Sequence, residues 1–97
     1  MTKSSNAKVT TDKASRYLQQ MCKHFSHKLD VDFDRESGEI FFPFGKLNMR
    51  AGESELTLSV TTEGDLETLA KMEKATADHL IRFMFREEPK IDWTRTD

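Results

Sequence analysis

The chain has 97 residues, and its 15 lysines and arginines stand against 17 aspartates and glutamates, for a net charge of −2. This length is enough for one domain and too short for two. The near-neutral charge argues against a general nucleic-acid binder, which usually carries a basic excess. No segment is apolar enough for a membrane helix. The single cysteine, Cys22, cannot close an internal disulfide, and the N-terminal residues lack the apolar core of a signal peptide, so we expect a cytoplasmic protein.

The chain begins with a predicted tail, a short strand and a helix. Residues 1–6 are small and polar, so we expect a flexible tail there and one folded domain over residues 7–97. Residues 7–10 alternate like a short strand. A helix is predicted from Thr11, a suitable capping residue, to about His27, because its apolar side chains share one face at about 100° per residue. These side chains are Ala14, Tyr17, Leu18, Met21 and Phe25.

Four antiparallel strands are predicted over residues 29–61, where apolar and polar residues alternate with a period of two. Pro43 falls within the second of them and cannot donate a ladder hydrogen bond, so we expect that strand at a sheet edge or bulged. The side chains predicted to face the core are Leu29, Val31, Phe33, Ile40, Phe42, Phe44, Leu47, Met49, Leu56, Leu58 and Val60.

A second helix is predicted after residues 62–65, whose Thr-x-x-Asp pattern is typical of helix starts. Its apolar stripe runs from Leu66 to Met84, and the helix must end before Pro89. We expect Trp93, in the short C-terminal segment, to fold back over the core. The predicted fold is α+β: a two-layer sandwich in the order β-α-β-β-β-β-α, with an antiparallel meander sheet and both helices on one face.

Several short motifs along the chain form a recognisable combination. They are Ala14-Ser15-Arg16-Tyr17-Leu18, Cys22-Lys23-His24-Phe25-Ser26-His27-Lys28, Phe42-Pro43-Phe44-Gly45, His79-Leu80-x-Arg82-Phe83 and Ile91-Asp92-Trp93. In these motifs the chain resembles the bacterial domain-of-unknown-function family 2218. The resemblance implies a stand-alone two-layer α+β domain, similar in strand order to TATA-binding-protein-like sheets, and no established activity. It also implies an association with iron–siderophore uptake systems, which family members are often encoded near.

The histidines suggest a metal site. His24 and His27 lie about 60° apart around the first helix, so both can contact one ion, whereas Cys22 points away from them. Two ligands are too few for a structural zinc site, and His79 can join them only if the two helices lie side by side. The structural interpretation is that His24 borders the core, His27 is solvated and Cys22 is buried and inert.

A basic stripe on the same helix, which includes Arg16, Lys23 and His27, suggests a site for an anion or an acidic partner. Arg16 is the best single candidate, because its planar fork suits a carboxylate or phosphate. The competing interpretation is a solvated basic face. A calcium loop beginning at Asp30 is rejected, because Arg35 and Phe41 stand where such a loop needs glycine and glutamate.

Glu73 is the least expected residue, because it falls near the middle of the apolar stripe of the second helix. A buried carboxylate needs a partner or a raised pKa, and Tyr17 or Lys28 on the first helix can supply that partner. The functional interpretation is a general acid or base in a pocket between the helices. The structural interpretation is an ion pair or an outward tilt at a groove.

These observations predict a small binding or accessory domain without evident catalysis and without a cofactor. Its expected partner is an unknown protein or a small anionic ligand bound by Arg16, Lys23, His27 and Glu73. One alternative is a metal- or siderophore-chelate-linked protein that uses His24, His27 and His79, with iron or another transition metal. The other alternative is an enzyme with Glu73 and Arg16 in a cleft.

Overall fold

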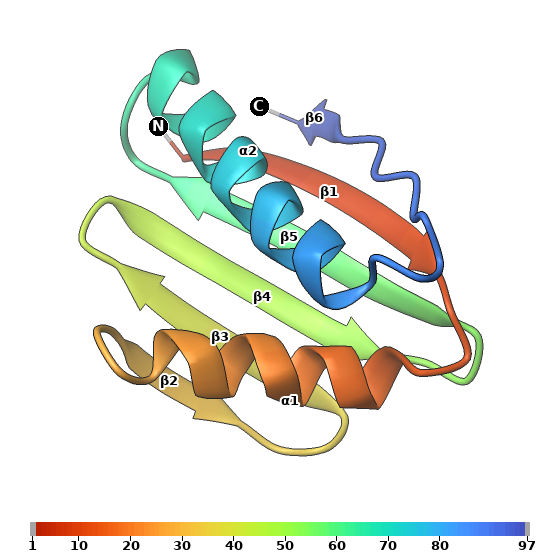
Figure 1. Ribbon diagram of the computed structural model, residues 1–97. Coiled ribbons are helices and arrows are strands. Elements are labelled where there is room, and N and C mark those ends of the chain that lie inside the picture. Colours follow the sequence, from red (N-terminus) through yellow and green to blue (C-terminus); the bar gives the residue numbers. More distant parts are fainter. Residues whose placement is uncertain (1, 97) are drawn as a thin grey trace.

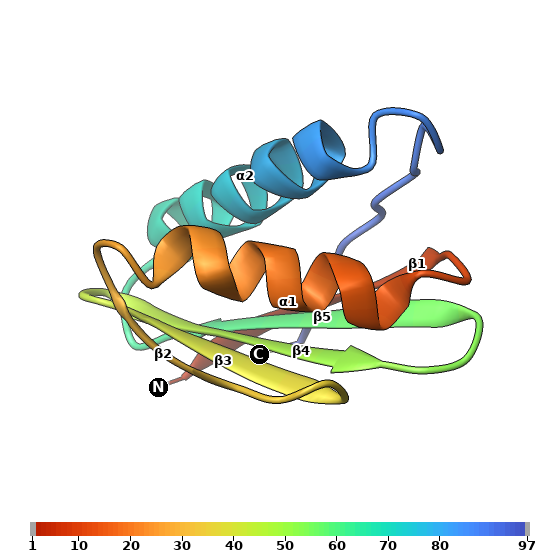
Figure 2. The ribbon, with the colours of Figure 1, turned by 60° about the horizontal axis from the view of Figure 1, so that its bottom comes forward.

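The computed structural model describes residues 2–96 as a six-stranded antiparallel sheet and two helices (Figure 1). As predicted, the fold is α+β, and both helices lie on one face of the sheet (Figure 2). No helix in this range is long and apolar enough to cross a membrane. The elements in chain order are β1 (Lys3–Thr10), α1 (Ala14–Phe25), β2 (Asp30–Phe33), β3 (Ser37–Phe42), β4 (Gly45–Ala51), β5 (Glu55–Thr62), α2 (Leu66–Phe83) and β6 (Thr94–Thr96).

The sheet has the order β2-β3-β4-β5-β1-β6. Strands β2 to β5 form the predicted meander, each antiparallel to the next. The N-terminal strand β1 then pairs along its whole length with β5, from Lys3 opposite Thr62 to Thr10 opposite Glu55. The short C-terminal strand β6 adds to the outer side of β1. Both ends of the described chain therefore meet at one edge of the sheet.

The N-terminal strand begins earlier than the sequence predicts. Residues 3–6 belong to β1 and pair with β5, so the expectation of a flexible tail is wrong for these four residues. Ser5 is fully buried on the helix-covered side of the sheet. Apolar alternation cannot identify a strand at a position where the inward residue is a serine, and this explains the error.

Two further strands differ from expectation. The strand that approaches Pro43 is the interior strand β3, and it ends at Phe42, so the proline needs no ladder hydrogen bond and the edge or bulge assignment is wrong. Strand β6 was not expected, because three exposed residues, Thr-Arg-Thr, carry no apolar alternation. The first helix begins at Ala14, later than its candidate cap Thr11 would place it. The second begins at Leu66, directly after residues 62–65. In α2 the cap is Asp65, whose carboxylate accepts from the Thr68 backbone N–H at 2.9 Å.

The core lies between the helices and the covered face of the sheet. Cys22 is completely buried there, as predicted, and packs so closely on Gly38 that a Cβ on this glycine would lie 2.7 Å from the Cys22 Sγ. Trp93 and Ile91 pack against the rim of the core, as expected. Phe44 does not, because it lies in the β3–β4 turn and is 49% exposed. The largest fully buried side chains are Leu18, Met21, Ile40, Leu47, Leu56, Leu58, Leu69, Met72, Leu80, Met84, Val9 and Val60.

Candidate functional site

Six rings form a continuous cluster where α1, α2 and the β3–β4 turn meet. Ring centroids of neighbouring members lie between 4.8 and 5.7 Å apart, within the range of favourable ring–ring contacts. We call this set the histidine–aromatic cluster. Its members are His24 and Phe25 from α1, His79 and Phe83 from α2, Phe42 from the end of β3 and Phe44 from the turn.

The two histidines form the centre of this cluster. The ring centroids of His24 and His79 are 5.2 Å apart, and the Phe25 ring contacts both of them. The His79 Nδ1 lies 2.8 Å from the backbone oxygen of Ala75. A carbonyl oxygen can only accept, so Nδ1 carries the proton and donates. In the neutral ring, the Nε2 of His79 therefore keeps a free lone pair.

The surroundings of His24 are positively charged. Desolvation of the ring lowers the pKa of His24, and the neighbouring His79, His27, Arg82 and Lys28 lower it further. His24 is therefore neutral at pH 7, and its lone pair is available. Arg82 and Lys28 place positive charge beside the neutral His24 ring, so this surface favours an anion over a bare cation.

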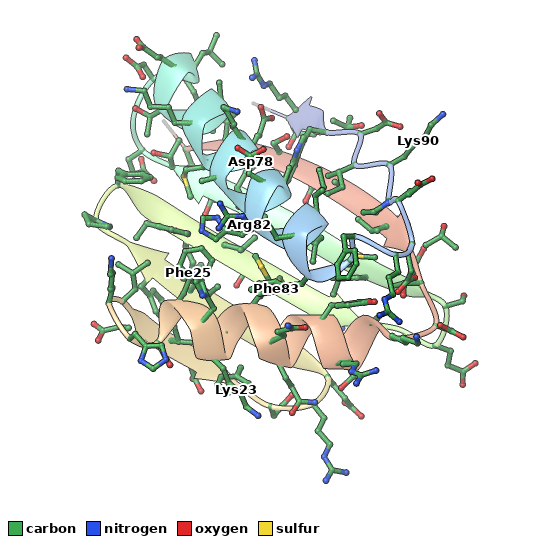
Figure 3. The ribbon with its side chains drawn as sticks, in the orientation of Figure 1. Lys23, Phe25, Asp78, Arg82, Phe83 and Lys90 are labelled. Atoms are coloured by element: carbon green, nitrogen blue, oxygen red, sulfur yellow. The ribbon has the colours of Figure 1, made fainter. Side chains whose placement is uncertain are left out.

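Figure 3 shows how the helices share this surface. Phe25 lies on the side of α1 that is turned toward α2, and Arg82 and Phe83 lie on the facing side of α2. Lys23 points away from α2, on the far side of α1. The cationic and aromatic side chains between the helices thus come from both elements, and their spacing depends on how the helices pack.

The three predicted metal ligands are only partly brought together. His24 and His79 meet, but His27 is exposed and takes part in none of the ring contacts. Across residues 2–96 there is no group of three or more histidine, cysteine, aspartate or glutamate side chains placed to hold a metal ion. Cys22 lies on the core side of α1, and burial raises the pKa of its thiol to about 11, so it is neither a ligand nor a nucleophile at neutral pH.

The basic stripe lies on the exposed outer side of α1. Arg16 and Lys23 line a shallow hollow of about 510 Å³ together with Ser15, Gln19 and Gln20. Glu73 is not among the residues that line it. This hollow therefore brings Arg16 and Lys23 together without Glu73.

Glu73 is buried as predicted, but its partner is not the predicted one. The carboxylate accepts two hydrogen bonds from Arg95 on β6, one from Nη2 at 2.8 Å and one from Nε at 3.1 Å. Arg95 is also the main cause that lowers the pKa of Glu73. The nearby Ser5 hydroxyl lowers it as well, although it makes no hydrogen bond of ordinary geometry. Tyr17, the first predicted partner, instead donates to the Glu87 carboxylate.

An ionised, doubly hydrogen-bonded carboxylate is a structural group. Its lowered pKa means that it holds no proton to donate at neutral pH, and both of its oxygens accept from Arg95, so the general acid or base interpretation of Glu73 loses its support. The sequence could not indicate the true partner, because Arg95 belongs to the short strand that carries no periodic signal. Its register opposite Ser5 puts it on the helix-covered face of the sheet.

The comparisons with known proteins agree with the fold. A family model described as "Uncharacterized protein conserved in bacteria (DUF2218)" matches residues 6–94. The NMR structure of PA4090 from Pseudomonas aeruginosa is similar, with 32% sequence identity and a TM-score of 0.79 over 97% of this chain and 96% of that chain. No curated protein matches. None of these findings indicates a function.

Proposed function

The chain belongs to DUF2218, a family of uncharacterized bacterial proteins, and from this premise we propose that it is a small binding domain without catalysis, whose ligand is a planar, aromatic anion. The observation that carries the proposal is the histidine–aromatic cluster with cations at its margin. The ligand stacks on the rings, and its negative charge pairs with the cationic side chains beside them.

The composition of the cluster supports this ligand class. His24 and Phe44 are exposed, so a ring can reach them without unfolding the helices. The charged groups that act on His24 are all basic, and Arg82 supplies a planar guanidinium that suits a carboxylate. The binding interpretation is also favoured over an enzyme because Glu73, the candidate acid or base, is held in an ion pair.

A second candidate ligand is an anionic metal chelate. It is favoured by the approach of His24 to His79, whose Nε2 is free. Imidazole suits several transition metals, and two imidazoles complete a coordination sphere when the chelator fills the other positions. Iron is the candidate metal, and an iron–siderophore uptake system is the partner that the family association suggests. The proposal includes a cytoplasmic location, which the unpaired Cys22 favours.

Two-dimensional NMR titrations with 2-hydroxybenzoate test the first candidate. We expect saturable shifts at residues 24–25, 42–44 and 79–83, and no comparable response to benzyl alcohol, which has a ring without a charge. Arg82→Gln should weaken binding at least tenfold, because it removes the guanidinium partner. Arg16→Gln is the matched control on the outer side of α1, and it should leave binding unchanged. Shifts confined to the Arg16 surface, or none at millimolar ligand, would refute the proposal.

The ferric complex of 2-hydroxybenzoate separates the two candidates. If a chelate is the ligand, the complex binds at least tenfold tighter than the free anion, and His79→Gln abolishes only this gain, because glutamine retains polarity but not an imidazole lone pair. His27→Gln is the control, since this exposed histidine lies outside the cluster. Equal affinities for the ferric complex and the free anion would support the anion as the ligand and refute the chelate as a candidate.

A further inference from the structure

Both helices lie on one side of the sheet, which leaves its other face open (Figure 2). This open face carries a hollow of about 660 Å³. Strands β2 to β5 all contribute to its lining, and its volume lies in the range of small-molecule sites. The side chains that extend into it from this face alternate with the buried ones. They are Asp32, Ser37, Glu39, Asn48, Arg50, Thr57 and Ser59.

The strand register arranges these side chains in rows across the sheet. Asp32 lies directly opposite Glu39, Glu39 opposite Asn48, and Asn48 opposite Ser59. Adjacent strands are about 4.8 Å apart, so the row presents two carboxylates and then an amide and a hydroxyl at regular intervals. Arg50 lies in the next row, diagonal to Glu39 at a Cα separation of roughly 7–8 Å.

The charges in this hollow are not neutralised by the protein. Asp32 and Glu39 are like charges in direct cross-strand register, an arrangement that destabilises a sheet. Neither of them pairs with Arg50, and within the described 95 residues none of the three takes part in an ion pair or a side-chain hydrogen bond. Asp34, at the rim, differs, because its carboxylate accepts from the backbone N–H groups of Glu36 and Ser37 at 2.8 Å each.

We propose that this hollow binds a small zwitterion, with its ammonium between Asp32 and Glu39 and its carboxylate on the Arg50 guanidinium. An ammonium carries three N–H donors, which match the two carboxylates and the Asn48 side-chain oxygen. The guanidinium presents a fork of donors that a carboxylate fills. The positive and the negative end of the ligand then each meet side chains of opposite charge. This site is on the other face of the sheet from the histidine–aromatic cluster and does not depend on it.

The ligand class is tested with 6-aminohexanoate in a two-dimensional NMR titration. Pentylamine and hexanoate are the matched probes, since each resembles it but lacks one charged end, and sodium chloride controls for ionic strength. We expect saturable shifts at residues 32, 39, 48 and 50, with both single-charge probes at least tenfold weaker. Equal affinity for all three probes, or shifts that sodium chloride reproduces, would refute the proposal.

Matched variants locate the site. Asp32→Asn and Arg50→Gln should each weaken binding of 6-aminohexanoate at least tenfold. Asp30→Asn and Lys46→Gln remove the same charges from the same face of the same two strands, but both residues lie outside the hollow, and these controls should change affinity less than twofold. If variants and controls lose affinity equally, binding depends only on the overall electrostatic field of the sheet face, and the assigned site is wrong.

A melting experiment provides a second readout that needs no ligand. Glu39→Gln should raise the thermal midpoint, because it relieves the repulsion with Asp32, as expected for a strained arrangement that is kept for binding. The residue lies on the open face, so the variant is expected to fold. A lowered midpoint would show that Glu39 serves the stability of the sheet, which would count directly against the proposal.

Discussion

The two faces of the sheet are made by the same strands and have opposite characters. Along β5, residues alternate between complete burial under the helices and partial exposure on the open side. The covered face holds the apolar core, and the open face holds carboxylates, amides and hydroxyls. The stability of the fold is therefore concentrated on one face, which leaves the side chains of the other free to vary or to bind without loss of the fold.

The largest difference in stability is expected between substitutions at two neighbouring residues of β5, whose side chains lie on opposite faces of the sheet. Leu58→Ala removes a fully buried side chain and should lower the free energy of unfolding by about 2–5 kcal/mol. Ser59→Ala, one residue on, should change it by no more than about 0.5 kcal/mol. Urea denaturation of both variants measures the contrast. Similar losses in the two would mean that the open face carries stability as well.

An intermediate effect on stability is expected at Glu73, the charged residue that is buried on the covered face. Glu73→Gln keeps the shape of the side chain but loses the charge-assisted bonds to Arg95, so we expect a loss of about 1–2 kcal/mol at pH 7. The folded pKa of Glu73 is below its ordinary value of 4.5. Stability from this pair is therefore complete above that value and is lost as the pH falls through the folded pKa.

Denaturation at several pH values tests this prediction, because the difference between Glu73→Gln and the native chain should shrink as the pH falls below 4.5. Glu67→Gln, on the same helix, is the control. The Glu67 carboxylate lies 3.8 Å from Lys71, but both side chains are exposed, and an exposed ion pair contributes little to stability. A difference that stays constant with pH would show that the pair does not titrate as proposed.

The smallest effect is expected at the margin of the covered face, in the histidine–aromatic cluster. The pKa of His24 is lowered in the folded state, so protonation favours unfolding, and stability should decline as the pH falls below the ordinary value of 6.5. His24→Gln should remove this decline, whereas His27→Gln should retain most of it, because desolvation and His79 lower the pKa of His24 more than His27 does. Thermal melts between pH 5 and 8 measure both, and identical pH profiles for the two variants would contradict the assignment.

Structural features that follow from a repeating pattern of apolar residues were predicted correctly from the sequence. Alternation in β3, β4 and β5 identified the inward side chains, and helical spacing identified the buried faces of α1 and α2. The prediction failed where tertiary contacts determine whether a residue is buried or belongs to a strand. Ser5 in β1 carries no apolar signal, and Phe44 lies in a turn whose exposure depends on where β3 ends.

The candidate sites show the same division. Burial of Glu73 followed from its position on the helix, but its partner Arg95 comes from a strand that only the sheet order places beside it. The approach of His24 to His79 depends on how the two helices cross, which no single-helix pattern contains. Unpaired charges on the open face became visible only with the strand register, since an acidic row alone is typical of a solvated strand.

The position of β1 between β5 and β6 also matters while the chain is being synthesised. Strand β1 leaves the ribosome early, but its nearest partner in the sheet is β5, which follows only after α1 and the first three strands of the meander. The meander pairs neighbours in sequence and can form as it emerges, whereas β1 must wait for a distant partner. Its polar open-side residues, Ser4, Asn6, Lys8 and Thr10, keep this waiting strand soluble and poor at pairing with other chains.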